Sequence, residues 1–201
     1  MRYGLLADIH EDVEFLRAGL DRLEREGVDR LIMLGDVFEH GRCLAETVAA
    51  LMAAPVVGVW GNHDFGLCRE THDEVRQRFG PAIMAYFASL RPWLEFEDCL
   101  FTHVEPWRDA ENLLDLWTSG AEELPVRSFS ERSHRLMIHG HHHRWKVLTP
   151  DGRVAWDCFH PLKLDPDRRY VIEVGAVCDG RCGILDTGAN LLIPLDLRDG
   201  D

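Results

Sequence analysis

The chain has little positive charge and no long apolar run, and each of these shortages excludes a class of protein. Its 201 residues carry a formal net charge of −13 at pH 7. Because binding to nucleic acids or anionic membranes needs a basic patch, we expect neither kind of partner. No apolar segment is long enough to cross a bilayer, and no basic start followed by an apolar stretch indicates a signal peptide. We therefore expect a cytoplasmic protein.

The chain also lacks paired cysteines. Its six cysteines are scattered and include no CxxC pair, which argues against a zinc ribbon or a disulfide framework. Buried free thiols are the expected alternative. Cys178 and Cys182 lie close enough in sequence to warrant a test for redox pairing.

The composition that is present is that of a soluble globular protein. Hydrophobic residues make up 46% of the chain and charged residues 28%. A chain of this length is able to bury a full core, and no linker or repeat divides it. We expect a single domain over residues 1–201.

The stretch from Val56 to Asp64 is the one around which the chain is organised. Its apolar run predicts a buried strand, which ends in a glycine and three polar residues, Asn62, His63 and Asp64. Open α/β sheets place ligand sites at the carboxyl ends of their strands. An Asn oxygen binds hard metals, His is the commonest acid or base, and a carboxylate can orient an imidazole. An ordinary Asn-containing turn is an equal alternative for this stretch alone.

Two earlier apolar runs end in the same way. The strand expected over 2–7 is followed by Asp8 and His10, which point to one side if the backbone is extended and can then hold one ion. The strand expected over 28–34 is followed by Asp36. The alternative is that these residues cap the next helix or turn. This alternative becomes less favoured as the same pattern recurs at further strand ends.

The spacing of apolar residues places helices between these strands. The expected helices are 11–26, 43–53 and, with a kink at Gly80-Pro81, 70–90. Alternating strands and helices predict a mostly parallel sheet with helices on its faces. The C-terminal part predicts hairpins that build a second sheet or complete a mixed one.

Histidines follow two further expected strands. His103 ends an apolar run, where a packed or capping His is the more common role. A second run leads into the densest imidazole cluster of the chain, residues 139–143. For His141 and His143 we favour metal ligation, because they share a side if extended. For His139 and His142 we favour a structural role around the site.

The order of these motifs resembles the calcineurin-like metallophosphoesterase superfamily, whose pattern is DxH, GDxx, GNH(D/E), an isolated His and GHxH. In this chain the pattern stands as Asp8-Ile9-His10, Gly35-Asp36, Gly61-Asn62-His63-Asp64, His103 and Gly140-His141-His142-His143. The resemblance implies an α/β fold, a four-layer α-β-β-α sandwich of two mixed sheets flanked by helices. The C-terminal segment is similar to the tail of the small bacterial and archaeal members.

The resemblance also implies a site with two divalent transition-metal ions, Mn, Fe, Zn, Ni or Co, with Mn favoured. One ion would be held by Asp8, His10, Asp36 and His143. The other would be held by Asp36, Asn62, His103 and His141, with Asp36 as the bridge. Such a pair neutralises a phosphate ester and lowers the pKa of a bridging water toward hydroxide. Oxygen and nitrogen ligands without thiolate suit these metals.

The implied activity is hydrolysis of a small phosphodiester or phosphomonoester. His63 would protonate the leaving oxygen as general acid, and Asp64 would orient its ring. Glu39-His40-Gly41 stands where protein serine/threonine phosphatases carry an Arg, so the chain is less similar to that branch. A protein-interaction scaffold that keeps the fold without catalysis is the alternative. Substrate specificity is expected in residues 65–69 and 105–133. For any single Trp or Arg of the second segment, however, a structural role in a surface connection is more common.

Overall fold

The computed structural model describes residues 1–69, 73–118 and 126–198, and within these residues the strands form two six-stranded sheets. The first sheet has the order β3-β2-β1-β11-β12-β9. Its strands are β3 (Val56–Val59), β2 (Arg30–Leu34), β1 (Arg2–Leu6), β11 (Arg181–Asp186), β12 (Leu191–Asp196) and β9 (Leu162–Lys163). β1, β2 and β3 are parallel, and the other pairings are antiparallel.

The second sheet has the order β4-β5-β6-β10-β7-β8. Its strands are β4 (Leu94–Phe96), β5 (Cys99–Phe101), β6 (Leu136–His139), β10 (Tyr170–Glu173), β7 (Lys146–Thr149) and β8 (Gly152–Arg153). β6 is parallel to both β5 and β10, so this sheet is also mixed. Among the hairpins predicted for the C-terminal part, one is formed by β7 and β8, which pair antiparallel.

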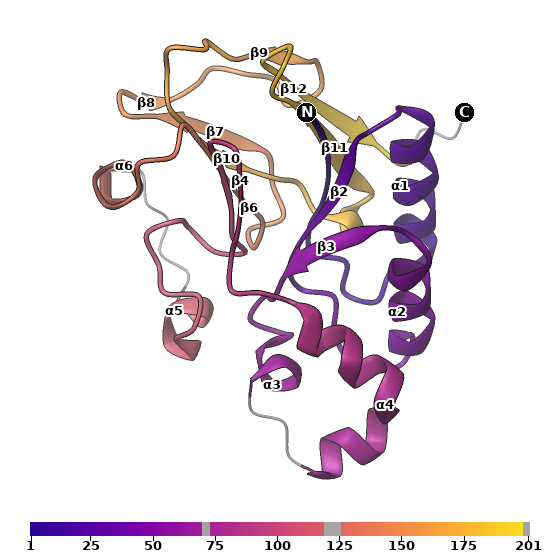
Figure 1. Ribbon diagram of the computed structural model, residues 1–201. Coiled ribbons are helices and arrows are strands. Elements are labelled where there is room, and N and C mark those ends of the chain that lie inside the picture. The colour runs from indigo at the N-terminus through magenta and orange to yellow at the C-terminus, as the bar shows by residue number, and fades with distance from the viewer. Residues whose placement is uncertain (70–72, 119–125, 199–201) are drawn as a thin grey trace.

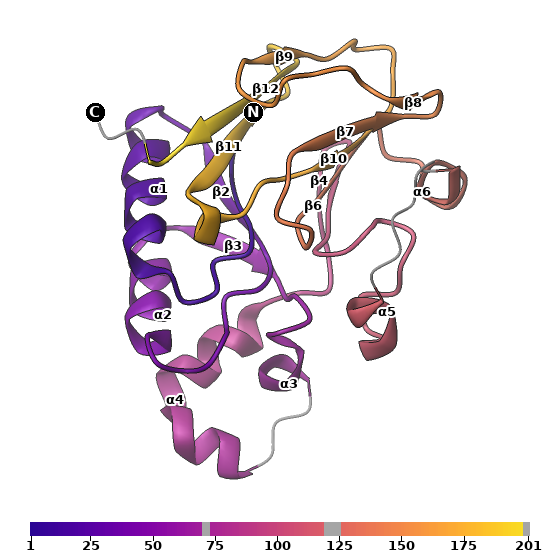
Figure 2. The ribbon, with the colours of Figure 1, turned by 180° about the vertical axis from the view of Figure 1, so that it is seen from behind.

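Helices cover both outer faces of this pair of sheets (Figure 1). They are α1 (Val13–Arg25), α2 (Leu44–Ala53), α3 (Phe65–Cys68), α4 (Asp73–Ser89), α5 (Leu113–Trp117), α6 (Val126–Glu131) and the 3-10 helix η1 (Val177–Asp179). Seen from behind, α1 and α2 flank the first sheet while α5 and α6 lie beside the second (Figure 2). The predicted four-layer α-β-β-α sandwich is confirmed.

Alternation along the strands explains why the layers form. In β2, Ile32 and Leu34 are fully buried in the core between the sheets, while Leu31 and Met33 pack with the helices on the opposite face. A strand that is apolar on both faces has to be covered on both, which is the condition inside a sandwich. The core therefore fixes the first sheet between two layers.

The expected helices are present with shorter ends. α1 begins at Val13 because the Asp12 carboxylate accepts the backbone N–H of Phe15 at 3.0 Å, an N-cap. α4 carries the expected kink, where Gly80 has a φ of 77° and precedes Pro81. The first three residues of the helix expected over 70–90 lie outside the described part of the chain.

The cysteines are free, as expected, but they are not uniformly buried. Cys99 and Cys182 are buried, Cys43 is exposed, and the remaining three are half-buried. The prediction of buried thiols is therefore wrong for most of them. Cys178 and Cys182 do not form a disulfide. None of the described helices has the length and apolar character that a bilayer crossing requires.

Candidate metal centre

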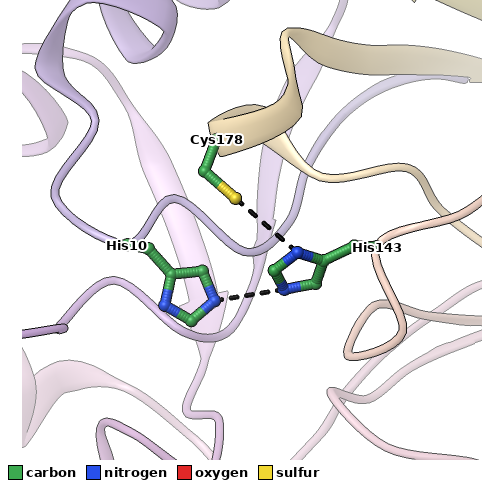
Figure 3. Close-up of side chains that lie close together, drawn as sticks. All are labelled: His10, His143 and Cys178. Carbon is green, nitrogen blue, oxygen red and sulfur yellow. Dashed lines mark hydrogen bonds between the residues drawn. The ribbon is translucent and has the colours of Figure 1, made fainter.

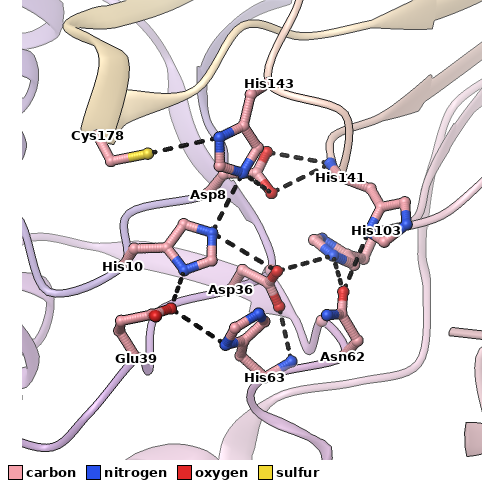
Figure 4. A network of polar contacts seen from close by, with 12 residues as sticks. Asp8, His10, Asp36, Glu39, Asn62, His63, His103, His141, His143 and Cys178 are labelled. Carbon is pink, nitrogen blue, oxygen red and sulfur yellow. Dashed lines mark hydrogen bonds and ion pairs between the residues drawn. The ribbon is translucent and has the colours of Figure 1, made fainter. Parts of the chain in front are cut away.

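Five loops from the two sheets meet at one edge of the sandwich (Figure 4). Each loop follows a strand, and parallel strands bring their carboxyl ends to the same edge. The side chains that meet there are Asp8 and His10 after β1, Asp36 after β2, Asn62 and His63 after β3, His103 after β5, and His141 and His143 after β6. These eight residues come from distant parts of the chain, and the sequence motifs named all of them.

One group of donor atoms surrounds His143. Its Nε2 lies 3.2 Å from Nε2 of His10 and 3.6 Å from Oδ1 of Asp8. Nε2 of His10 lies in turn 3.7 Å from Oδ2 of Asp36. Two imidazole nitrogens and two carboxylates thus face one small volume.

A second group surrounds Asn62. Its Oδ1 lies 2.9 Å from Nε2 of His103 and 3.0 Å from Nδ1 of His141. Nε2 of His103 lies 3.3 Å from the same Asp36 Oδ2 that faces His10. Asp36 therefore stands between the two groups. Four of its neighbours form compact sets of possible metal donors with it, His10 and His63 in one set and His103 and His141 in another.

The donor set fits divalent transition metals. It consists of carboxylate oxygens, one amide oxygen and imidazole nitrogens, which are ligands for Mn, Fe, Co, Ni or Zn. A carboxylate shared by two groups of donors is the arrangement that holds two cations close together. The assignment of Asp8, His10, Asp36, Asn62, His103, His141 and His143 as ligands stays a prediction, and the geometry fits it.

The backbone at these positions is strained, which the sequence did not indicate. Five of the predicted ligands have left-handed backbone conformations, with φ between 47° and 78°. They are Asp8, His10, Asp36, His141 and His143. Non-glycine residues adopt this region at a cost and keep it where the surrounding fold demands it, often at functional sites. The premise of an extended backbone is therefore wrong for both His-containing pairs, although the pairs do reach the site. His141 and His143 face different groups of donors.

Gly61 permits the close approach of β3 to the Asp36 loop. A Cβ at position 61 would overlap the Asp36 carboxylate and lie 2.6 Å from the Asp36 backbone nitrogen. The Asp36 Oδ1 atom instead accepts the backbone N–H of His63 at 3.0 Å. The glycine before the Asn-His pair is thus needed to bring the central carboxylate against the neighbouring loop.

Burial and mutual charge govern protonation of the metal-free site. Burial raises the pKa of Asp8 to about 8. Burial alone works to raise the pKa of Asp36, but the charge of His103 and a hydrogen bond from it hold that pKa well below its usual range. The same pair raises the pKa of His103 to about 10 against the effect of its burial. Protons on Asp8 and His103 thus offset the crowded carboxylates, and bound cations would displace them.

Glu39 is a site residue that sequence reasoning missed. Its Oε2 accepts from Nδ1 of His10 at 2.8 Å and lies 3.1 Å from Nδ1 of His63 (Figure 4). One carboxylate therefore contacts both a predicted metal ligand and the predicted general acid. The available signal was an acidic residue three positions after Asp36, in a loop that ends in Gly41.

Asp64 has a different role from the one expected. Its Oδ1 accepts the backbone N–H groups of Val37 and Phe38, at 3.0 and 2.9 Å, and its Oδ2 accepts that of Gly61 at 3.0 Å. The prediction that Asp64 orients the His63 ring is corrected: the ring nitrogen faces Glu39, and the fully buried Asp64 ties the loop after β2 to the loop after β3.

Glu11 positions Glu39 through the backbone. Its carboxylate accepts four N–H groups of the loop after β2, those of Glu39, His40 and Gly41 on Oε1 and that of Cys43 on Oε2. These bonds lower the pKa of Glu11 although its burial acts in the opposite direction. The loop that presents Glu39 is therefore fastened at four points.

His139 and His142 lie behind the site, in keeping with the structural role expected of them. Nε2 of His142 lies 3.4 Å from Glu105, which also accepts the Nε–H of Arg108 at 2.6 Å. Glu105 follows His103 by two residues, so its contact with His142 joins the His103 loop to the loop of His141 and His143. Arg108 is thus committed to Glu105, and Arg127 lies over the Trp107 ring at 3.9 Å.

Cys178 approaches the site from η1. Its Sγ lies 3.7 Å from Nδ1 of His143, while Nε2 of the same ring faces His10 (Figure 3). His10, His143 and Cys178 also form a compact set of possible donors. The sequence had linked Cys178 only to Cys182.

The site opens into a cavity of ≈ 530 Å³. Its lining residues are His10, Asp36, Glu39, Asn62, His63, Trp117, His141, His143 and Cys178. Trp117, at the end of α5, belongs to the 105–133 segment in which specificity was expected. Phe65 and Leu67 from the other expected segment are buried in the core and do not line the cavity.

A sandwich of two mixed sheets with strand-end His, Asp and Asn residues at one edge is the architecture of the metallophosphoesterases. A model of the calcineurin-like phosphoesterase superfamily domain matches residues 1–183. The chain therefore belongs to this superfamily, as the motif resemblance predicted, and membership implies divalent metal ions.

Comparisons with individual proteins agree with this assignment. An uncharacterized protein of Methanocaldococcus jannaschii is 24% identical over 90% of this chain and 78% of its own length. The crystal structure of a metallophosphoesterase from Sphaerobacter thermophilus superposes with a TM-score of 0.78 at 21% identity, covering 98% of this chain and 87% of that one. An archaeal phosphodiesterase gives a TM-score of 0.58 at 16% identity, covering 98% and 99%. These two likenesses show the fold.

Proposed function

We propose that this phosphoesterase is a single domain over residues 1–201 that hydrolyses a small phosphodiester or phosphomonoester at a pair of divalent cations, with Mn²⁺ favoured. Asp8, His10, Asp36 and His143 would hold one cation, and Asp36, Asn62, His103 and His141 the other. When bound, such a pair neutralises phosphate oxygens and activates a water as nucleophile. A cytoplasmic location remains part of this proposal.

The chain's own residues supply positioning and a proton. Oδ2 of Asp36 is the donor that the two groups share. Its distances to His10 and His103 set how far apart these two groups of donors lie. Nδ1 of His63 faces Glu39 at 3.1 Å, which leaves Nε2 to donate a proton to the departing oxygen as general acid. Proton transfer of this kind contributes about 10²- to 10⁴-fold in rate.

One observation carries the proposal. The Asp36 carboxylate lies between two groups of nitrogen and oxygen donors, 3.7 Å from His10 Nε2 on one side and 3.3 Å from His103 Nε2 on the other. A scaffold without metal gains nothing from six such donor residues around the buried Asp36 carboxylate, since burying them costs free energy.

The test is hydrolysis of bis(p-nitrophenyl) phosphate and p-nitrophenyl phosphate by protein stripped with a chelator and reloaded with Mn²⁺. We expect activity only after reloading, and large losses in Asn62→Ala and His63→Ala. His160→Ala is the matched control, because His160 is an exposed His that contacts Asp157 away from the cavity. Undiminished activity in the Asn62 and His63 variants contradicts the proposal. A protein that binds no metal after the reloading step and hydrolyses no phosphate ester would favour the scaffold alternative.

A further inference from the structure

Trp117 is a large aromatic side chain that stays exposed beside the site. Its exposed fraction is 54%, although its ring lies in the cavity wall with the His and Asp residues described above. The ring centroid is 5.2 Å from that of His63, with 42° between the planes. The two rings touch at a tilt, so His63 leaves much of the indole face uncovered.

The exposure of Trp117 does not arise from a loosely held helix. The preceding residue, Leu116, is fully buried in the core. At the start of α5 the Asn112 side chain accepts the backbone N–H of Leu114 at 2.9 Å, and the backbone N–H of Leu116 donates to Asn112 at 3.1 Å. Capped by Asn112 and held to the core by Leu116, α5 presents the indole to the cavity.

The other walls of the cavity are polar. They consist of imidazoles, carboxylates and an amide, with the Cys178 thiol at one side. An indole in such a wall gains little from its neighbours and leaves apolar surface in water, which is unfavourable. A planar aromatic group of a ligand would cover this surface, and stacking on aromatic side chains is a general way to bind bases irrespective of their identity.

We propose that Trp117 is a specificity-determining residue that stacks on a planar aromatic group of the substrate, so that the preferred substrates are nucleotide-type or aryl phosphate esters. This inference rests on the proposed function, because it places the aromatic group on the leaving side, next to the proton donor His63. An ester whose leaving oxygen is within hydrogen-bond reach of His63 brings the group attached to that oxygen alongside the indole.

Binding without turnover tests the inference. Calorimetry of the Mn²⁺-loaded protein with phenylphosphonate and methylphosphonate compares ligands that differ in an aromatic ring next to phosphorus. AMP and ribose 5-phosphate differ in a base several bonds from phosphorus. They are compared by competition for the site, at times too short for turnover. The two arms distinguish an aryl ester from a nucleotide. We expect about tenfold or greater preference for the aromatic member in at least one arm.

Variants identify the side chain responsible. Trp117→Ala should abolish the preference and leave the affinity for the non-aromatic member unchanged, while Trp117→Phe should retain part of it. Leu114→Ala is the matched control, since Leu114 is 76% exposed on the same helix, and it should keep the full preference.

Several outcomes overturn the inference. The first is a wild-type protein without preference in either arm, and the second is a preference that survives in Trp117→Ala. The third is a Trp117→Ala variant that loses activity equally on all substrates with an unchanged preference, which would mean that the indole only positions His63. Failure of the proposed function is read separately, as absence of hydrolysis by the reloaded wild-type protein, because the binding preference is measured without turnover.

Discussion

Replacing Glu39 by Gln should separate proton donation from metal binding. The Glu39 carboxylate contacts Nδ1 of His10 at 2.8 Å and Nδ1 of His63 at 3.1 Å. A Gln side chain keeps the length but carries no charge, so it interacts more weakly with the two imidazole rings, whose Nδ1 atoms both face Oε2 of Glu39. Losing a partner that orients a catalytic or metal-binding His typically costs about 10- to 100-fold in activity. We expect a fall in kcat of that size at saturating Mn²⁺.

The dependence on the leaving group makes this test specific. Phenolate is a poorer leaving group than p-nitrophenolate and needs protonation more. The loss in Glu39→Gln should therefore be larger for diphenyl phosphate than for bis(p-nitrophenyl) phosphate, and His63→Ala should show the same trend more strongly. Glu46→Gln is the matched control, because the Glu46 side chain is 67% exposed on α2. Equal losses on both substrates, or no loss, would refute the role assigned to the Glu39–His63 contact.

Two further predictions concern the packing around the site. Gly61→Ala should displace Asp36 and lower the free energy of unfolding by about 1–3 kcal/mol. It should also lower the amount of bound Mn²⁺, although no ligand is removed. A melting temperature and a metal content equal to those of wild type would contradict this prediction. Burial works to raise the pKa of Glu105, but the hydrogen bond from His142 and the charges of His139 and Arg108 lower it from 4.5 to about 2. A carboxyl group whose pKa is lower in the folded than in the unfolded protein stabilises the fold at pH values above its unfolded-state pKa. This stabilisation is lost as the pH falls through its folded-state pKa. Near neutral pH the metal-free wild type should therefore have a free energy of unfolding on the order of 3 kcal/mol higher than Glu105→Gln. In urea titrations this difference should shrink between pH 4.5 and about 2, and a constant difference would be inconsistent with the ion pair.

The sequence was informative where chemistry and strand ends coincide. An apolar run predicts a strand, and polar residues directly after several such runs predict a common edge once the sheet is parallel. This reasoning placed Asp36 and Asn62 at one edge, and the family resemblance added His103, although the three residues lie far apart in the chain. The amphipathic period of α1 and the Gly80-Pro81 kink were equally legible, because they depend on local residues.

Features set by loop geometry were not predictable. Glu39 contacts the His63 ring in place of Asp64, since the direction of each carboxylate depends on the paths of the loops after β2 and β3. The left-handed backbone at His141 and His143 sends these side chains to different donor groups, which alternation along an extended strand does not anticipate. Trp117 reaches the cavity through an irregular segment without a period that predicts its path.

Anomalous diffraction from crystals grown with Mn²⁺ is the most direct test of the two-cation centre. Two peaks are expected on either side of the Asp36 carboxylate, about 3.5–4 Å apart, one beside His10 and His143 and the other beside Asn62 and His103. A single peak at saturating Mn²⁺, or peaks remote from Asp36, would contradict it.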